Sequence, residues 1–389
     1  MTTAQQVVAN RVQEDAPALL DLSHRVHAHP EAAWEEHRAA AWVGEAMKEA
    51  GFEVTSGYLG LDTAVRAEYG SGPLTVVVCA EYDALPGLGH ACGHNVIAAS
   101  SVGAARALAA VADPLGLRVV LLGTPAEEGG GGKIALLDRG AFDDAHLALM
   151  AHPGPVDVAE ARPYSVTHWA VTYTGKAAHA AAYPEDGRNA ADAFTLAQVA
   201  IGLLRQQLPS TVRVHGLLTR GGEVPNAIPE LTRGRWYVRG ETTAERVAAE
   251  GRVRRCFEAG ALATGCELQV ELESPPYSEF RNDPDLLASY RRNAEALGRR
   301  FDDADTALGR MNRASTDMGN VSQRIPSIHP YIGIDSAPAV NHQREFAAHC
   351  VGPTADRAVL DAATALASTV VDAATDAQVR ARLLERRTP

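Results

Sequence analysis

The sequence predicts an α/β protein in which a large domain with a mostly parallel sheet carries a smaller α+β domain as an insertion. In residues 1–163, strand and helix patterns alternate, which is typical of a parallel sheet covered by helices. In residues 164–283 the order becomes β-α-β-β-α-β, the order of a ferredoxin-like split βαβ unit. Because the alternating pattern resumes in residues 284–389, we expect the two outer segments to form one domain around the inserted one.

The first outer segment begins with two predicted helices. They cover Val7–His27 and Ala32–Ala50, and His29-Pro30 separates them. Of the strands predicted at 64–69 and 74–79, the second reads LTVVVC, a continuous apolar run typical of a strand covered on both faces. The elements that follow are a helix at 95–111, a strand at 118–122, a helix at 133–139 and a strand at 146–150.

The inserted segment and the last segment continue the series. In the inserted segment we expect strands at 166–173, 212–218, 231–239 and 267–273, with helices at 190–207 and 243–263. The residues SPPYSEFRNDP then form a linker. The last segment is expected to hold a helix at 286–297, a strand at 328–334 and a helix at 354–374.

Composition excludes several classes of partner. The formal net charge of −12 repels phosphate backbones and anionic lipid surfaces, so we expect neither nucleic acid nor membrane partners. We also find no run of about 18 apolar residues that would span a membrane. The N-terminus lacks the features of a secretory signal, and five sparse cysteines suit a reducing compartment. These observations favour a cytoplasmic protein.

Polar side chains follow the predicted strands of the large domain where those strands end, and α/β enzymes bind their ligands at this edge of the sheet. Glu81-Tyr82-Asp83 and the loop GLGHACGHN follow one strand, and Glu127-Glu128 follow the next. His152-Pro153 and Asn341-His342 follow two later strands. Five of these side chains are of types that bind zinc or a similar divalent ion: Cys92, His94, Glu128, His152 and His342.

Five ligands exceed the three that one catalytic ion needs beside its open position. Two ions that share a thiolate would use all five. Two ions also suit hydrolysis, because one lowers the pKa of water and both stabilise a developing oxyanion. Glu127 and Glu128 are neighbours at a strand end and point to opposite sides. One of them can therefore bind metal while the other serves as general base and then as acid for a leaving amine.

Several segments together resemble the M20 metallopeptidase family of aminoacylases, carboxypeptidases and amidohydrolases. The nearest pattern is the branch with the M20 domain-containing 2 dipeptidases and the aminobenzoyl-glutamate hydrolases. The segments are EYDALPGLGHACGHN, GTPAEEGGGGK, MAHP, GKAAHAAAYPEDGRNAADA, GGEVPNAIPE, STDMGNVSQRIPSIHPYIGI and APAVNHQREF, and they span Glu81 to Phe346. The resemblance implies a two-metal large domain, an inserted domain that acts as lid and dimerisation surface, and a homodimer.

The resemblance also implies roles for individual residues. Cys92 would bridge two divalent ions, zinc or manganese, and Glu127 would be the general base. The ions would be held by His94 and His152 on one side and by Glu128 and His342 on the other. Asp83 would orient a ligand, and His179 would reach the substrate carbonyl, in the partner subunit's site. The expected substrate contacts are Asn226 and Arg239 in the inserted domain, and Thr316 and Asn320 in the STDMGN segment.

One departure from the wider family concerns the strand end. More distant members have His-x-Asp there, with the histidine as a metal ligand, whereas this chain has Glu81-Tyr82-Asp83. His94, two residues after Cys92, takes the place of that histidine in the resembling branch. The choice of metal is therefore open.

Other interpretations of these residues explain less. Cys92 as a buried thiol, or as a nucleophile with His94 as base, leaves the glutamate pair without a role. His90 is expected to pack or to form a hydrogen bond behind the ligands, and the glycines after Glu128 form a tight turn without the spacing of a P-loop. The histidines expected to be structural are His24, His27, His29, His37 and His329.

The leading hypothesis is a metal-dependent hydrolase that cleaves the amide bond of N-acyl amino acids or dipeptide-like amides carrying a carboxylate. A broad dipeptidase or carboxypeptidase is the alternative among enzymes, because it needs the same metals and a carboxylate anchor. A catalytically inactive binding protein is the alternative from another class. The intact Glu127 and the full ligand set argue against it.

Overall fold

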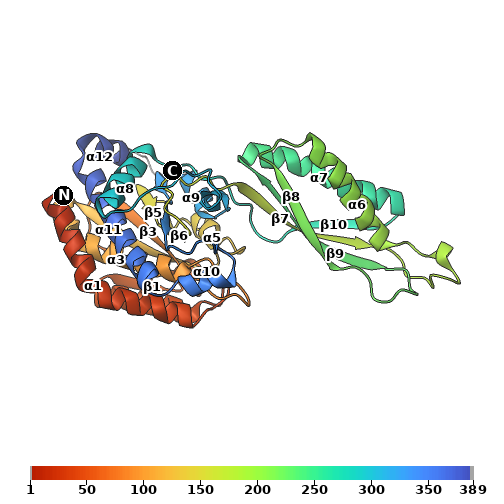
Figure 1. The fold of residues 1–389 in the computed structure, drawn as a ribbon, viewed down its shortest axis with the longest axis horizontal. Helices are drawn as coiled ribbons and strands as arrows, with labels where there is room; N and C mark the ends of the chain where they lie inside the picture. The colour runs from red at the N-terminus through yellow and green to blue at the C-terminus, as the bar shows by residue number, and fades with distance from the viewer. Residues whose placement is uncertain (1, 386–389) are drawn as a thin grey trace. The chain divides into compact units, whose positions relative to one another are not determined.

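The computed structural model of the protein describes residues 2–385 and consists of two compact units (Figure 1). Unit 1 combines Met1–Pro163 with Phe280–Pro389, and unit 2 is Tyr164–Glu279. The chain thus leaves unit 1 once, forms unit 2, and returns.

Unit 1 is built on a six-stranded mixed sheet in the order β1-β2-β4-β3-β5-β11. The strands β4 (Leu117–Thr124), β3 (Leu74–Glu81), β5 (Leu147–Leu149) and β11 (Ser327–Ile328) are parallel. At the other edge, β2 (Val65–Tyr69) and β1 (Glu53–Ser56) are antiparallel. The sequence did not predict β1, because EVTS is short and mostly exposed and so lacks an apolar pattern.

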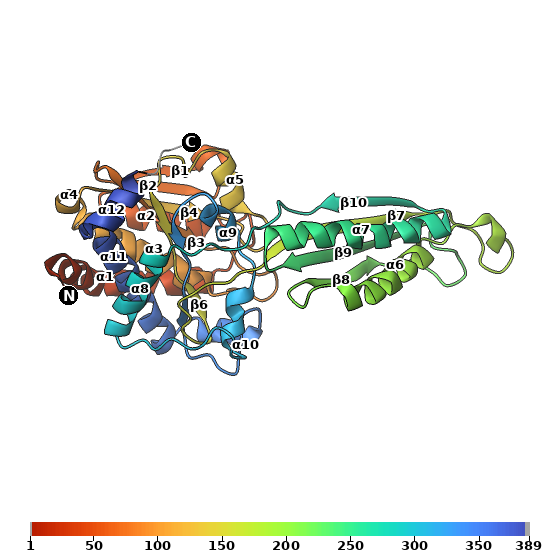
Figure 2. The ribbon, with the colours of Figure 1, turned by 90° about the horizontal axis from the view of Figure 1, so that it is seen from above.

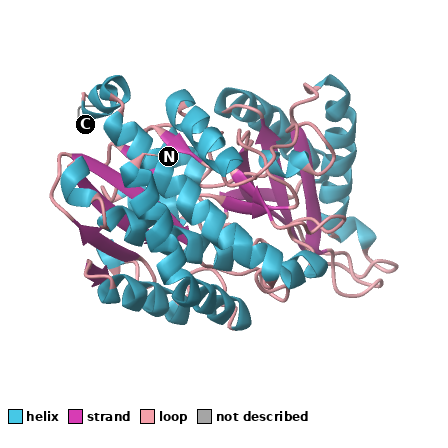
Figure 3. Ribbon diagram, turned by 60° about the vertical axis from the view of Figure 1, so that its left-hand side comes forward, coloured by secondary structure: helices cyan, strands magenta, loops and turns pink. Residues whose placement is uncertain are grey.

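Helices cover both faces of this sheet, which explains the apolar run in β3 (Figure 3). Every residue of β3 is buried. Val76 and Val78 belong to a core cluster with α1 (Thr3–Ala28), α3 (His94–Ala109) and α11 (Pro353–Thr375). On the opposite face, Val77 and Cys79 pack in a second cluster, to which α5 (Gly132–Asp138) and α9 (Met318–Ser322) contribute. Alternate residues of one strand thus fill two cores.

The helix α11 is long and apolar enough to cross a membrane by length and composition alone. However, 78% of its most apolar 18-residue window is buried within the protein. Its alanines and valines, among them Ala362, Leu366 and Val370, belong to the core cluster of unit 1. The hydropathy of α11 is therefore that of a core helix.

Two sequence-based element predictions for unit 1 were wrong. The strand predicted at 328–334 is two strands, because Pro330 offers no N–H: β11 pairs with β5, whereas β12 (Tyr331–Gly333) pairs with β6 (His152–Gly154) in a separate two-stranded sheet. The helix predicted from Ala32 begins at His37 as α2 (His37–Glu49). Residues 31–36 form a loop instead, in which Trp34 has a left-handed φ of 69°.

The remaining helices of unit 1 lie in its outer parts. They are α4 (Ala112–Leu115), α8 (Pro284–Ala296), α10 (Arg344–His349) and α12 (Ala377–Leu384), and three short 3₁₀ turns lie at Tyr58–Gly60, Gly309–Arg313 and, in unit 2, Pro184–Asp186.

Unit 2 is a four-stranded antiparallel sheet in the order β10-β7-β9-β8 with two helices on one face (Figure 2). The strands are β7 (Ser165–Thr174), β8 (Arg213–Arg220), β9 (Leu231–Gly240) and β10 (Glu267–Leu272), and the helices are α6 (Ala190–Leu204) and α7 (Thr243–Thr264). A 3₁₀ turn, Arg205–Gln207, extends α6. Trp169, Val171 and Tyr173 alternate along β7 and form the core with Trp236 and Phe257.

Candidate metal centre

The predicted ligands of unit 1 lie on loops and element ends beside the carboxyl ends of parallel strands. Glu81 is the last residue of β3, and Glu127 and Glu128 follow β4. Cys92 lies just before α3 and His94 begins it, whereas His152 begins β6. Parallel strands place their carboxyl ends at one edge of a sheet, so these segments meet there.

Two groups of three possible ligands share one residue. In the first, ligand atoms of Cys92, His94 and His152 lie within 4.8 Å of one another. In the second, the same limit holds for Cys92, Glu128 and His342. The Cys92 Sγ lies 3.4 Å from His152 Nε2, and His342 Nε2 lies 3.4 Å from Glu128 Oε1. The structure therefore brings together all five side chains that the sequence singled out as ligands.

The backbone around Cys92 holds the two groups in place. Gly93 has a left-handed φ of 81°, and a Cβ at that position would lie 2.4 Å from Pro153 Cγ. Only glycine fits this close approach, which brings the Cys92 loop against the His152 segment. His342 also has a left-handed φ, of 69°, and its N–H donates to the Ala91 carbonyl at 2.8 Å.

Hydrogen bonds orient the imidazole rings. Asp83 Oδ1 lies 3.0 Å from His94 Nδ1, and its Oδ2 accepts a bond of 2.9 Å from the Glu128 N–H. His152 Nδ1 lies 2.8 Å from the Pro153 carbonyl. Both rings therefore turn Nε2 towards the ligand groups, which is the usual arrangement of a metal-binding histidine.

The donor set fits divalent cations. Within residues 2–385, the buried atoms His94 Nε2 and Glu128 Oε1 have no hydrogen-bond partner. Buried nitrogen and carboxylate atoms without partners are costly unless they bind a cation or water. The combination of thiolate, imidazole and carboxylate is one that binds zinc and related ions.

Electrostatics favour a cation at the same place. Burial, followed by repulsion from Glu81 and Glu128, raises the pKa of Glu127 well above its usual value. Burial and the neighbouring Glu128 likewise raise the pKa of Cys92. Bound cations reverse such shifts because they stabilise the ionised forms. Glu127 Oε2 lies 3.9 Å from His94 Nε2, so this carboxylate borders the first ligand group.

Comparison with known proteins gives the family. Residues 77–371 match the model of peptidase family M20/M25/M40. The chain belongs to this family. A Xaa-Arg dipeptidase from Mus musculus is 40% identical over 380 residues, which cover 94% of this chain and 87% of the relative. The M20 resemblance inferred from the motifs is therefore confirmed, and the protein is a hydrolase.

Two further similarities agree. One of the two kinds of chain of the p-aminobenzoyl-glutamate hydrolase from Escherichia coli is 28% identical over 296 residues, covering 71% of this chain and 62% of the relative. A crystal structure of a dinuclear metal-binding M20 peptidase from Bacillus subtilis has a TM-score of 0.68 at 21% identity, with 92% of this chain and 99% of that chain covered. At this identity the second likeness supports the α/β fold alone.

The sequence did not assign a role to a buried ion-pair network beside the centre of this M20 chain. Lys133 Nζ lies 2.5 Å from Glu81 Oε1 and 2.6 Å from Asp317 Oδ1, and all three side chains are fully buried. Glu81 Oε2 lies in turn 3.5 Å from His94 Nε2. Only three lysines occur in the chain, and Lys133 follows the glycine turn next to Glu128. A lysine retained at such a place in a lysine-poor chain was the available signal.

We expect Lys133→Met to destabilise unit 1 strongly. The substitution leaves Glu81 and Asp317 buried without their cation, and breaking a buried pair in this way costs about 3–5 kcal/mol. The thermal unfolding midpoint should fall by roughly 10 °C. The exposed Lys48 on α2 provides a matched control, because Lys48→Met removes the same charge at the surface. Equal midpoints for the two variants would contradict the prediction.

The predicted substrate residues of unit 2 fall into two places. His179 is exposed, and its loop pairs with that of Asn226, whose carbonyl accepts a bond of 2.9 Å from the Ala180 N–H. Arg239 lies at the other end of β9, roughly 26 Å along the strand, with its Nε 3.2 Å from His215 Nε2. The structure therefore groups Asn226 with His179 and does not group Arg239 with them.

In the STDMGN segment, Asp317 is the residue with a described contact to the network. Its carboxylate accepts a bond from the Lys133 N–H at 2.8 Å as well as pairing with Nζ. Thr316 is buried, and its hydroxyl accepts the Met318 N–H at 3.2 Å, as a helix cap would. Substrate contacts by Thr316 and Asn320 stay predictions.

The histidines expected to be structural lie apart from the ligand groups, with one exception. His24 pairs with Asp356, and His27 Nε2 lies 2.7 Å from the Ala347 carbonyl. His329 is fully buried, and its ring centroid lies 5.5 Å from that of His152, so it packs directly against a ligand. Burial lowers the pKa of His90 to about 3, which keeps its buried ring neutral.

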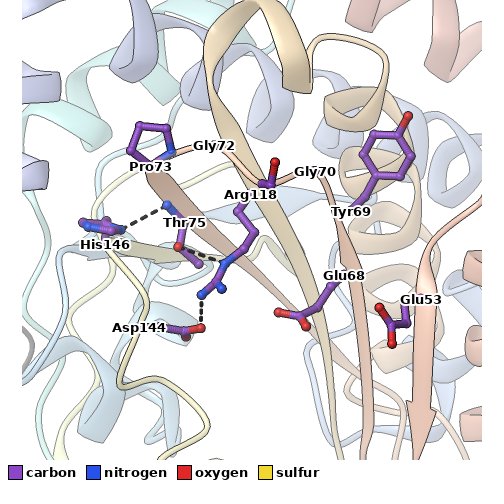
Figure 4. A pocket seen from close by; sticks show the side chains of 11 residues that line it. Glu53, Glu68, Tyr69, Gly70, Gly72, Pro73, Thr75, Arg118, Asp144 and His146 are labelled. Atoms are coloured by element: carbon purple, nitrogen blue, oxygen red, sulfur yellow. Dashed lines mark hydrogen bonds and ion pairs between the residues drawn. The ribbon is translucent and has the colours of Figure 1, made fainter.

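A groove of about 640 Å³ lies elsewhere in unit 1, at the amino end of β3 (Figure 4). Arg118 contacts Asp144 and Thr75 there, and His146 Nδ1 accepts the Thr75 N–H at 3.0 Å. These mutual contacts use the polar groups at the groove. None of the predicted ligands lines it, and it lies at the strand end opposite to the metal centre.

Proposed function

We propose that the protein is a two-metal amidohydrolase that cleaves N-acyl amino acids or dipeptide-like amides with a free carboxylate. The observation that carries the proposal is the pair of ligand groups sharing Cys92, with Glu127 beside them. Cys92 would bridge two zinc or manganese ions, held by His94 and His152 and by Glu128 and His342. When bound, such ions activate water and polarise the scissile carbonyl.

The chain's own residues would supply the proton transfers. Glu127 is 6% exposed and lies at the ligand groups, so its carboxylate is placed to accept a proton from the attacking water. The raised pKa of Glu127 favours the protonated form that must then give this proton to the leaving amine. Asp83 would keep His94 and the Glu128 backbone in position, because it bonds to both.

The relatives narrow the substrate class. The 40% identity to a Xaa-Arg dipeptidase over 94% of this chain favours dipeptides that end in a basic residue. Arg239 offers a contact for the substrate carboxylate, and burial lowers the pKa of this guanidinium. We place the reaction in the cytoplasm, on the grounds of composition given above.

The test is a hydrolysis screen of the purified protein with zinc and with manganese. We expect turnover of dipeptides such as alanyl-arginine and alanyl-lysine, and slower turnover of acetyl-amino acids. Preferential cleavage of p-aminobenzoyl-glutamate would favour the second candidate, which the relative from Escherichia coli suggests. No hydrolysis of any substrate, with about two ions bound per chain, would favour an inactive binding protein.

We further propose that the enzyme is a homodimer formed through unit 2. Leu196, Val199 and Leu203 recur along one face of α6 and are 43%, 58% and 61% exposed. The edge strand β8 adds Leu217 and Leu218, which are 57% and 41% exposed. A second copy of this surface would cover both the apolar side chains and the free strand edge.

His179 is proposed to complete the site of the partner subunit. Its Nδ1 accepts the N–H groups of Ala181 and Ala182, at 3.3 and 3.1 Å. In a neutral ring the proton then lies on Nε2, which can donate to an oxyanion. One such donor typically stabilises a transition state by about 3–4 kcal/mol.

Mixed dimers test this role of His179. We expect Glu127→Gln and His179→Ala chains each to be nearly inactive alone. In a mixed dimer, one site has both residues intact if His179 acts across the interface, so activity should return towards half of the wild-type value per dimer. If His179 serves its own chain, every site stays impaired. No recovery after proven exchange of chains would therefore refute the cross-subunit role.

A further inference from the structure

We propose that Glu36 is a positioning residue that fixes the backbone from which Glu127 and Glu128 project. The inference rests on the proposed function of those two residues. Glu36 lies on the loop before α2, is fully buried, and is far along the chain from the metal centre. Its side chain nevertheless reaches the turn that follows β4.

The Glu36 carboxylate accepts three hydrogen bonds. Its Oε1 accepts the Ala126 N–H at 2.8 Å and the Trp34 N–H at 2.9 Å. Its Oε2 accepts the Thr63 hydroxyl at 2.8 Å. One oxygen thus holds two backbone segments, those of residues 34 and 126, against each other.

Both of these segments have a backbone conformation that side chains disfavour. Ala126 has a φ of 57° and Trp34 a φ of 69°, in the left-handed region. A residue other than glycine needs support from its surroundings to stay there. Because both N–H groups bond to the same oxygen of Glu36, this carboxylate is placed to supply that support.

Ala126 sets the direction in which the next two side chains leave the strand. Glu127 and Glu128 follow it immediately, and the Glu128 N–H is held by Asp83 at 2.9 Å. The turn is therefore held by two carboxylates, Glu36 at its start and Asp83 two residues later. The Glu36 loop also reaches the Asp83 side of the site, since the Ala84 N–H donates to the Glu31 carbonyl at 2.8 Å.

The charge of Glu36 is not what this role requires. Burial, and then the nearby Asp83, raise the pKa of Glu36 to about 7, so the ionised form has no large advantage at neutral pH. The geometry needs an acceptor at the Oε1 position. Glutamine provides that acceptor, and its amide can donate to the Thr63 hydroxyl.

The test compares Glu36→Ala, Glu36→Gln, Ala126→Gly and the double variant Glu36→Ala/Ala126→Gly. Two quantities are measured: zinc affinity, by competition with a chromophoric chelator, and kcat and KM for alanyl-arginine. Loss of a group that positions metal ligands typically costs about 10–100-fold. We expect Glu36→Ala to lose this much in kcat and in affinity for the weaker zinc ion, with KM changed less than about threefold.

The partner variants separate positioning from a general effect on the fold. Glycine needs no support at a left-handed φ, so Ala126→Gly should restore at least roughly threefold of the loss in the double variant. Glu36→Gln and Ala126→Gly alone should stay within about threefold of wild type. Thr63→Ala, which leaves the Ala126 bond intact, is the matched control.

Three results would overturn the proposal. These are wild-type kcat and zinc affinity in Glu36→Ala, no restoration by Ala126→Gly in a folded double variant, or a loss above about 30-fold in Glu36→Gln. The glutamine variant decides the question even if Glu36→Ala does not fold. If the wild-type protein hydrolyses no substrate, the proposed function fails, but the zinc affinities still test the positioning role.

Discussion

Glu127→Gln is expected to reduce kcat by about 10²–10⁴ while about two ions per chain stay bound. Glutamine keeps the shape of the side chain but cannot accept a proton from the attacking water or return it to the leaving amine. Glu127 lies beside His94 without being part of either ligand group around Cys92. Metal binding and proton transfer should therefore separate at this residue.

The neighbouring Glu128→Gln is the matched control for this experiment. Glu128 belongs to the second ligand group, and its Oε1 lies 3.4 Å from His342 Nε2. Its substitution should lower metal content and activity together. Elemental analysis and steady-state kinetics on both variants distinguish the roles. Turnover of Glu127→Gln within a few-fold of wild type would remove Glu127 from the role of base.

The parts of the fold that were predictable are those with a strong local pattern. The apolar run of β3 and the alternation in β7 follow directly from burial on two faces and on one face. The ligand candidates were found because strand ends and residue chemistry are both visible in a sequence. The structure then brings Cys92, Glu128 and His152 together from three separate segments.

The parts that failed depend on distant partners or on single backbone angles. The segment 31–36 has helix-forming residues, yet the bond from Ala126 to Glu36 and the left-handed Trp34 keep it a loop. The pairing of Lys133 with Asp317 joins residues 184 positions apart. Such contacts have no periodicity, so only the folded chain reveals them. A strand that changes sheets at Pro330 leaves a similarly weak signal.

Cys92→Ser is expected to remove at least one ion and most of the activity. Cys92 is the one residue that the two ligand groups share, so its loss affects both. A serine hydroxyl ionises far less readily than a thiol and is a poor replacement for a bridging thiolate. Cys350→Ser is the matched control, because Cys350 is also buried and its Sγ lies near Gly93 without belonging to either group.

Chemical labelling tests the same role of Cys92 without mutation. Cys92 is 6% exposed, so an alkylating reagent reaches it slowly, and a thiolate bound between two cations is also withdrawn from reaction. We expect labelling of Cys92, located by peptide mass spectrometry, to be slow in the zinc-loaded enzyme and to accelerate on chelation. Labelling of the half-buried Cys256 on α7 should not respond, since that residue lies in unit 2. If the rate at Cys92 is the same with and without chelator, Cys92 is not a metal ligand, and the two-ion site loses the residue that joins its halves.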